Sequence, residues 1–166
     1  MARCSSLDSF LIRYNPDYQR EVCTKPEEAF FGDYPTLTDT RLTYGSNASV
    51  IWLLPQLYNL SEYCGCKDKL TKMQYEELAF VISTEYHYLK ISELMLFFYR
   101  FKTGRYGRLY GTVDPLVITD SLRKFCHERL IAYDRREQQL EEQRNLESRN
   151  NAITYEEYLR GKEVLR

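Results

Sequence analysis

The sequence lacks a long apolar run. Its longest apolar clusters cover residues 50–54 and 94–99, whereas a helix that spans a membrane needs about 20 consecutive apolar residues. The N-terminal residues also lack the apolar core of a secretory signal and carry an early acid, Asp8. We therefore expect no transmembrane segment and a cytoplasmic location.

Histidine is scarce, and the spacing of the cysteines and histidines matches no common disulfide or metal pattern. The five cysteines form an odd set without the regular spacing of a disulfide scaffold, so we expect free thiols. Cys64 and Cys66, with Cys126 and His127 far downstream, are zinc-ligand types, but structural zinc sites separate paired cysteines by at least about two residues. The sequence predicts no metal site and no cofactor.

A recognisable set of catalytic residues is also missing. The adjacent pairs Glu76-Glu77 and Glu141-Glu142 point to different sides of a helix, so neither pair forms a catalytic dyad alone. The glycines within residues 104–111 superficially resemble a phosphate-binding loop, but the Lys-Ser/Thr ending of that loop is missing, and a helical pattern precedes it where a strand is required. We expect a non-enzymatic protein without catalytic residues.

Tyrosine, by contrast, is abundant, with 15 residues in a chain of 166. Its ring is apolar and its tip polar, so a small core can use tyrosine where the hydroxyl reaches water. The alternative is a recognition surface lined with rings, on which nucleic-acid bases could stack. Composition leaves both interpretations open.

The net charge of -1 excludes a protein coated with cations for bulk nucleic-acid packaging. One segment, residues 99–111, nevertheless combines four cations, four aromatic residues and three glycines with no acid. Arginine pairs with phosphates and carboxylates, and rings offer stacking faces. The predicted nucleic-acid-binding patch consists of Arg100, Lys102, Arg105, Tyr106, Arg108 and Tyr110. The competing interpretation is structural: a helix stop and a tight turn whose rings pack over the core.

The spacing of apolar residues predicts an all-α protein, a compact bundle of four main helices near residues 47–63, 71–89, 92–103 and 115–149. Thr71 and Gln74 form a capping box for the second of these helices. Pro55 predicts a kink or break in the first, because proline removes an amide donor. The expected core is Leu78, Ile82, Leu94, Phe97, Phe98, Leu122 and Phe125.

The flanks of this bundle have less pattern. We expect an irregular N-terminal arm over residues 1–35, with one short helix capped by Thr24, and a helical core over residues 36–133. We expect residues 134–166 to form a charged C-terminal helical extension, because residues 134–149 contain only two large apolar side chains, Leu140 and Leu146.

Three segments carry a resemblance to known proteins: residues 52–57 (Trp-Leu-Leu-Pro-Gln-Leu), residues 92–98 (Ser-Glu-Leu-Met-Leu-Phe-Phe), and residues 104–111 continuing through Asp114-Pro115 and Arg129. On these segments the chain resembles an uncharacterised family of small bacterial proteins from chromosomes and mobile elements. Its members have no assigned activity, so the resemblance implies family membership and indicates no particular function. The helical layout and the basic Gly-Tyr turn are also similar to phage helicase loaders and replication accessory proteins.

These observations give two hypotheses for function. The first is a non-enzymatic protein that binds nucleic acid through the predicted patch, as a replication accessory factor of a bacterial mobile element. The alternative is a protein–protein interaction adaptor, in which residues 134–166 bind a partner or a second copy of the chain.

Overall fold

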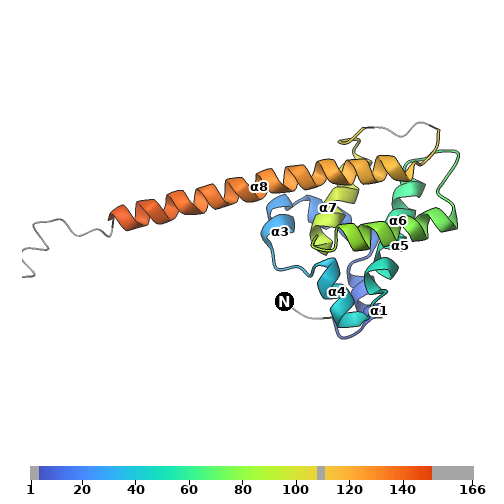
Figure 1. The fold of residues 1–166 in the computed structure, drawn as a ribbon, viewed down its shortest axis with the longest axis horizontal. Coiled ribbons are helices and arrows are strands. Elements are labelled where there is room, and N and C mark those ends of the chain that lie inside the picture. The colour runs from blue at the N-terminus through green and yellow to red at the C-terminus, as the bar shows by residue number, and fades with distance from the viewer. Residues whose placement is uncertain (1–3, 108–110, 151–166) are drawn as a thin grey trace, which may run out of the picture. The chain divides into compact units, whose positions relative to one another are not determined.

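The structure, a computed structural model, describes residues 4–107 and 111–150, and the regular elements of this part of the chain are all helical (Figure 1). The predicted all-α class is thus confirmed. The chain divides into two compact units, residues 1–129 and 130–166. The helices are, in chain order, α1 (Leu7–Arg13), the 3-10 turn η1 (Pro16–Tyr18), α2 (Gln19–Cys23), α3 (Pro26–Phe31), α4 (Leu37–Tyr44), α5 (Ala48–Tyr63), α6 (Lys72–Glu85), α7 (Ile91–Lys102) and α8 (Pro115–Asn150).

Local capping determines where several helices begin. The Thr71 hydroxyl accepts a hydrogen bond from the Gln74 amide at 3.3 Å, and the Gln74 side chain accepts one from the Thr71 amide at 2.8 Å. The predicted start of α6 is therefore confirmed. Asp114 caps α8 in a related way, because its carboxylate accepts a hydrogen bond from the Leu116 amide at 2.8 Å.

Helix α5 continues through Pro55, so the break that was one of the two predicted outcomes does not occur. A proline removes one backbone hydrogen bond from a helix interior. In α5 the flanking residues Trp52, Leu53 and Leu57 are completely buried, and their burial favours the helix on both sides of the proline. Tertiary packing thus outweighs the local preference.

Helix α7 is the centre of residues 1–129, because all side chains from residue 91 to residue 98 are buried. The predicted core residues, including Leu94, Phe97 and Phe98, are confirmed as buried. The polar members of this stretch have partners: the Ser92 hydroxyl donates to the Ala29 carbonyl at 2.8 Å, and the Glu93 carboxylate accepts from Arg129 Nε at 2.7 Å.

The N-terminal segment is more ordered than predicted. The expected irregular arm with one short helix contains α1, η1, α2 and α3, and Phe10 and Val22 are buried. Each element is too short to show a helical period, and burial of its apolar residues stabilises it. The predicted Thr24 cap is wrong: α3 begins at Pro26, and the Thr24 hydroxyl donates to the Glu21 carbonyl at 2.7 Å.

A buried polar network attaches this N-terminal segment to α5. The Tyr14 carbonyl accepts hydrogen bonds from Trp52 Nε1 at 2.8 Å and from Gln56 Nε2 at 3.0 Å. Gln19 Nε2 donates in turn to Gln56 Oε1 at 2.6 Å. Because an unpaired buried polar group costs about 1 to 3 kcal/mol, these bonds specify how the segment packs.

In the second unit, the described side chains of residues 134–149 are all exposed. Leu140 and Leu146 have exposed fractions of 39% and 57%. This part of α8 is therefore a charged helix without a buried face.

We expect Phe98→Ala to lower the free energy of unfolding by about 3 to 5 kcal/mol, because the substitution leaves a cavity beside α7. Chemical denaturation measures the change. Phe80→Ala is the control, because Phe80 is 61% exposed, and it should change stability by less than about 0.5 kcal/mol. Equal losses in the two variants would contradict the assignment of the core.

Candidate functional site

The basic segment begins in the last turn of α7, which contains Arg100 and Lys102, and continues into a glycine-rich turn. Gly104 and Gly107 have φ angles of +77° and +118°, which side chains on other residues rarely allow. Two members of the predicted patch, Arg108 and Tyr110, lie outside the described residues.

Arg100 is largely enclosed by the protein. Its Nη1 donates to Glu128 Oε2 at 3.0 Å, and its side chain is only 17% exposed. The guanidinium carbon lies 5.6 Å from the ring centroid of Phe30 and 5.9 Å from that of Phe125. Arg100 therefore combines an ion pair with two cation–π contacts inside the fold.

Arg105 and Tyr106 contact the same carboxylate. Arg105 Nε donates to Glu128 Oε1 at 2.9 Å, although the Arg105 side chain remains 52% exposed. The Tyr106 hydroxyl donates to Glu128 Oε2 at 3.4 Å, and its ring centroid lies 5.8 Å from that of Phe97. Tyr106 is only 9% exposed, and burial raises its pKa to about 12. The phenol is thus neutral and packed into the core.

Lys102 also has partners within the protein. Its Nζ donates to Gln19 Oε1 at 2.7 Å and to Asn59 Oδ1, and it lies 5.7 Å from the ring centroid of Tyr63. Burial lowers the pKa of Lys102 below its ordinary value. This ammonium group therefore extends the buried polar network.

The structure places three of the described patch residues inward and leaves Arg105 half exposed. The segment is free of acids in the sequence, but α8 brings Glu128 to it in space. Sequence reasoning missed Glu128, although a signal was present: it lies three residues after Phe125, on the expected inward side of this helix.

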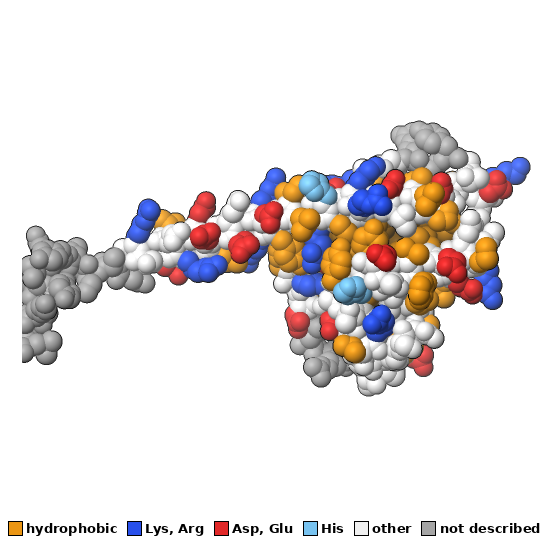
Figure 2. Space-filling model, viewed as in Figure 1, with side chains coloured by type: hydrophobic (Ala, Val, Ile, Leu, Met, Phe, Trp, Pro, Cys, Tyr) orange, Lys and Arg blue, Asp and Glu red, His pale blue; other side chains and the backbone are white. Residues whose placement is uncertain are grey.

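A second feature is a groove of about 600 Å³ between α6 and the first turns of α8. Figure 2 shows hydrophobic side chains gathered in the band between these two helices. The groove is lined by exposed apolar residues, among them Met73, Val81 and Leu116, together with the buried Leu78. Sequence reasoning missed it, because Met73, Val81 and Leu116 lie outside the predicted buried faces of their helices.

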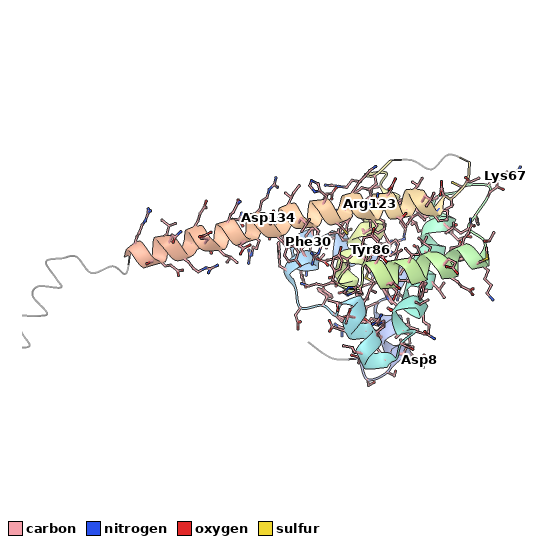
Figure 3. The ribbon with its side chains drawn as sticks, viewed as in Figure 1. Asp8, Phe30, Lys67, Tyr86, Arg123 and Asp134 are labelled. Atoms are coloured by element: carbon pink, nitrogen blue, oxygen red, sulfur yellow. The ribbon has the colours of Figure 1, made fainter. Side chains whose placement is uncertain are left out.

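Charged groups border the groove unevenly. Glu77 and Glu85 contribute to its lining and form no ion pair with the described residues. Arg123, which Figure 3 labels on α8 together with Tyr86 from the end of α6, donates from Nη1 to Asp120 at 2.8 Å. Asp120 therefore neutralises the charge of Arg123, and Glu77 and Glu85 give the rim of the groove an excess of negative charge.

Two other kinds of site are absent from the part of the chain that the structure describes. The described residues contain no group of three or more His, Cys, Asp or Glu side chains that could hold a metal ion. Among the helices of the described part of the chain, none is both long and apolar enough to cross a membrane.

We expect the coupling between Arg100 and Glu128 to exceed that between Arg105 and Glu128. A double-mutant cycle with Arg100→Ala and Glu128→Gln should give about 1 to 3 kcal/mol, because this pair is partly desolvated. The cycle with Arg105→Ala should give less than about 1 kcal/mol, since solvent screens the exposed guanidinium. Chemical denaturation of the single and double variants measures both values, and the reverse order would contradict the structure.

Comparison with known proteins adds one family match. No curated protein and no solved structure matches the chain significantly. The family of unknown function DUF6633 matches residues 69–165, a region that includes the groove helix α6, the central helix α7 and Glu128. This match covers more than half of the sequence and agrees with the resemblance to an uncharacterised family: the chain belongs to DUF6633.

Proposed function

We propose that this protein is a non-enzymatic protein–protein interaction adaptor that binds an amphipathic helix of its partner in the groove between α6 and α8. The observation that carries the proposal is the exposure of apolar side chains along the groove: Met73 is 69% and Leu116 is 74% exposed. Grouped apolar side chains at a concave surface are typical of binding sites.

The dimensions and charge of the groove favour a basic helix as its occupant. Helix α6 lines the groove from Met73 to Glu85, a length of roughly 18 Å, which suits about three turns of a partner helix with apolar residues at i, i+4 and i+7. Glu77 and Glu85 on the rim would pair with lysine or arginine beside that apolar face. Charge complementarity thus selects the partner.

The contacts of the basic turn favour the adaptor hypothesis over the nucleic-acid hypothesis. Glu128 binds both Arg100 and Arg105, and Tyr106 is packed against Phe97, which favours the structural interpretation of the turn. The sequence-based adaptor hypothesis placed partner binding in residues 134–166, whereas the apolar groove lies within residues 1–129. We expect the partner to be a bacterial protein, as the resemblance to proteins of bacterial chromosomes and mobile elements implies, and to share the cytoplasmic location that we expect for this chain.

We expect a designed helical peptide with leucine at i, i+4 and i+7 and lysine on its flanks to bind about tenfold more tightly than the same peptide with glutamate flanks. Fluorescence anisotropy of the labelled peptides measures both affinities. Leu116→Ser should weaken binding of the lysine peptide by about tenfold, because it removes apolar contact.

Leu42→Ser is the matched control, because Leu42 is 79% exposed on α4 and does not line the groove. It should leave the affinity unchanged. Equal binding of the two peptides would contradict the preference for a basic helix, and normal binding by the Leu116→Ser variant would exclude the groove as the docking surface.

Nucleic-acid binding is the second candidate, favoured by the half-exposed guanidinium of Arg105. If this candidate holds, replacing Arg105 and Arg108 with alanine should weaken binding of a single-stranded oligonucleotide and lower the salt slope by about 2, because each phosphate contact releases about one counterion. Titrations at several salt concentrations measure the slope. Replacing Arg41 and Lys67 instead controls for net charge, and equal slopes in the two double variants would dismiss the patch.

A further inference from the structure

A cavity of about 360 Å³, separate from the groove, lies against α1, α4 and the residues that precede α4. Its lining includes four aromatic rings, those of Phe10, Tyr14, Tyr34 and Tyr44. Such a concentration of rings around one small cavity is a chemical feature that neither the basic turn nor the apolar groove shares.

The rings form a connected arc. Tyr34 and Tyr14 have ring centroids 6.5 Å apart, Tyr14 and Phe10 are 4.9 Å apart, and Phe10 and Tyr44 are 5.2 Å apart. Phe10 and Tyr14 are buried, whereas Tyr34 and Tyr44 are half-buried at the two ends of the arc. The cavity thus has a packed aromatic floor and partly accessible aromatic flanks.

These rings offer neutral π surfaces. The Tyr44 hydroxyl donates to the Cys4 carbonyl at 2.9 Å, and the Tyr34 hydroxyl donates to Glu28 at 3.4 Å. Burial raises the pKa of the Tyr14, Tyr34 and Tyr44 phenols above their ordinary value, so all three are uncharged at neutral pH. The ring faces attract cations through their quadrupole; the Arg13 guanidinium carbon already lies 5.4 Å from the Tyr14 ring centroid.

Two carboxylates complete the lining. Asp33 and Asp39 are exposed and border the cavity, and no lysine, arginine or histidine is among its described lining residues. The Thr36 amide and hydroxyl both donate to Asp39 Oδ2, at 2.9 and 2.7 Å, and they hold the Asp39 pKa below its usual value. Asp39 is therefore ionised at neutral pH, and Asp33 forms no ion pair with the described residues.

We propose that this cavity binds an organic cation of the quaternary ammonium class. Its methyl groups would contact the faces of Tyr34 and Tyr44 over the floor of Phe10, and its charge would lie near Asp33 and Asp39. Aromatic faces combined with acids select such a cation over a neutral molecule of the same shape. A metal ion is less suitable, because the described residues contain no group of three or more His, Cys, Asp or Glu side chains that could hold one.

The test uses the full-length protein and two probes of equal shape, choline and its neutral isostere 3,3-dimethylbutan-1-ol. Two-dimensional NMR titration should show choline binding about tenfold more tightly than the alcohol, because only choline carries the charge. Equal affinities would overturn the proposal. Absence of choline binding up to about 50 mM, at which a millimolar site would be saturated, would overturn it as well.

Substitutions then assign the binding to this cavity. Tyr34→Leu should weaken choline binding by about tenfold, and Asp33→Asn should weaken it several-fold without affecting folding, because Asp33 is exposed. Tyr58→Leu is the control: Tyr58 is 57% exposed on α5, outside the cavity. Unchanged affinity in the Asp33→Asn variant would overturn the assignment even if Tyr34→Leu failed to fold.

A third arm compares two sources of the same chemical group. A short peptide containing Nε-trimethyl-lysine presents a quaternary ammonium on a protein, whereas choline presents it on a free small molecule. Tighter binding of the peptide supports a methylated protein as the ligand, and tighter binding of choline supports a small metabolite. Both outcomes support the site, and neither depends on whether the groove binds a helix.

Discussion

The burial of residues 91–98, the first two thirds of α7, is the constraint on which the rest of the structure depends. A buried carboxylate is stable only with a partner, so Glu93 requires Arg129, and the two pair at 2.7 Å. Near the other end of α7, Arg100 pairs with Glu128 at 3.0 Å. Glu128 and Arg129, which are adjacent in α8, thus pair with a base near the end of α7 and with an acid near its start. The acid near its start and the base near its end also complement the helix dipole.

The same constraint accounts for the basic turn. Cations at the end of a buried helix must either reach solvent or find acceptors, and the described cations Arg100, Lys102 and Arg105 all have acceptors. Lys102 joins the network through Gln19, which hydrogen-bonds Gln56 on α5. The basic segment, which the sequence predicts to bind nucleic acid, therefore also connects the N-terminal helices, α5 and α8 to the end of α7. Among its described cations, only Arg105 keeps substantial exposure to solvent.

The two proposed sites use side chains that this core does not require. Met73 and Leu116 are exposed although they are apolar, so they lower the free energy of the protein only if something covers them. Tyr34 and Tyr44 are half-buried, and the acids beside them have no cationic partner among the described residues. The groove suits an apolar basic helix and the cavity suits a compact organic cation, so the two ligands differ in size and in chemistry.

Local interactions explain what the sequence by itself determined. The all-α class, the cap of α6 at Thr71 and the buried faces around Phe98 follow from interactions among residues a few positions apart, and patterns in the sequence record these directly. Tertiary structure decided the rest. It kept α5 helical through Pro55, ordered the N-terminal helices against α5 and α7, and placed Glu128 beside cations more than 20 residues earlier in the chain. It also assembled the groove and the aromatic cavity from separate segments. The stability of these features depends on contacts between side chains that are distant in the sequence, and local sequence patterns do not show which of those side chains come into contact.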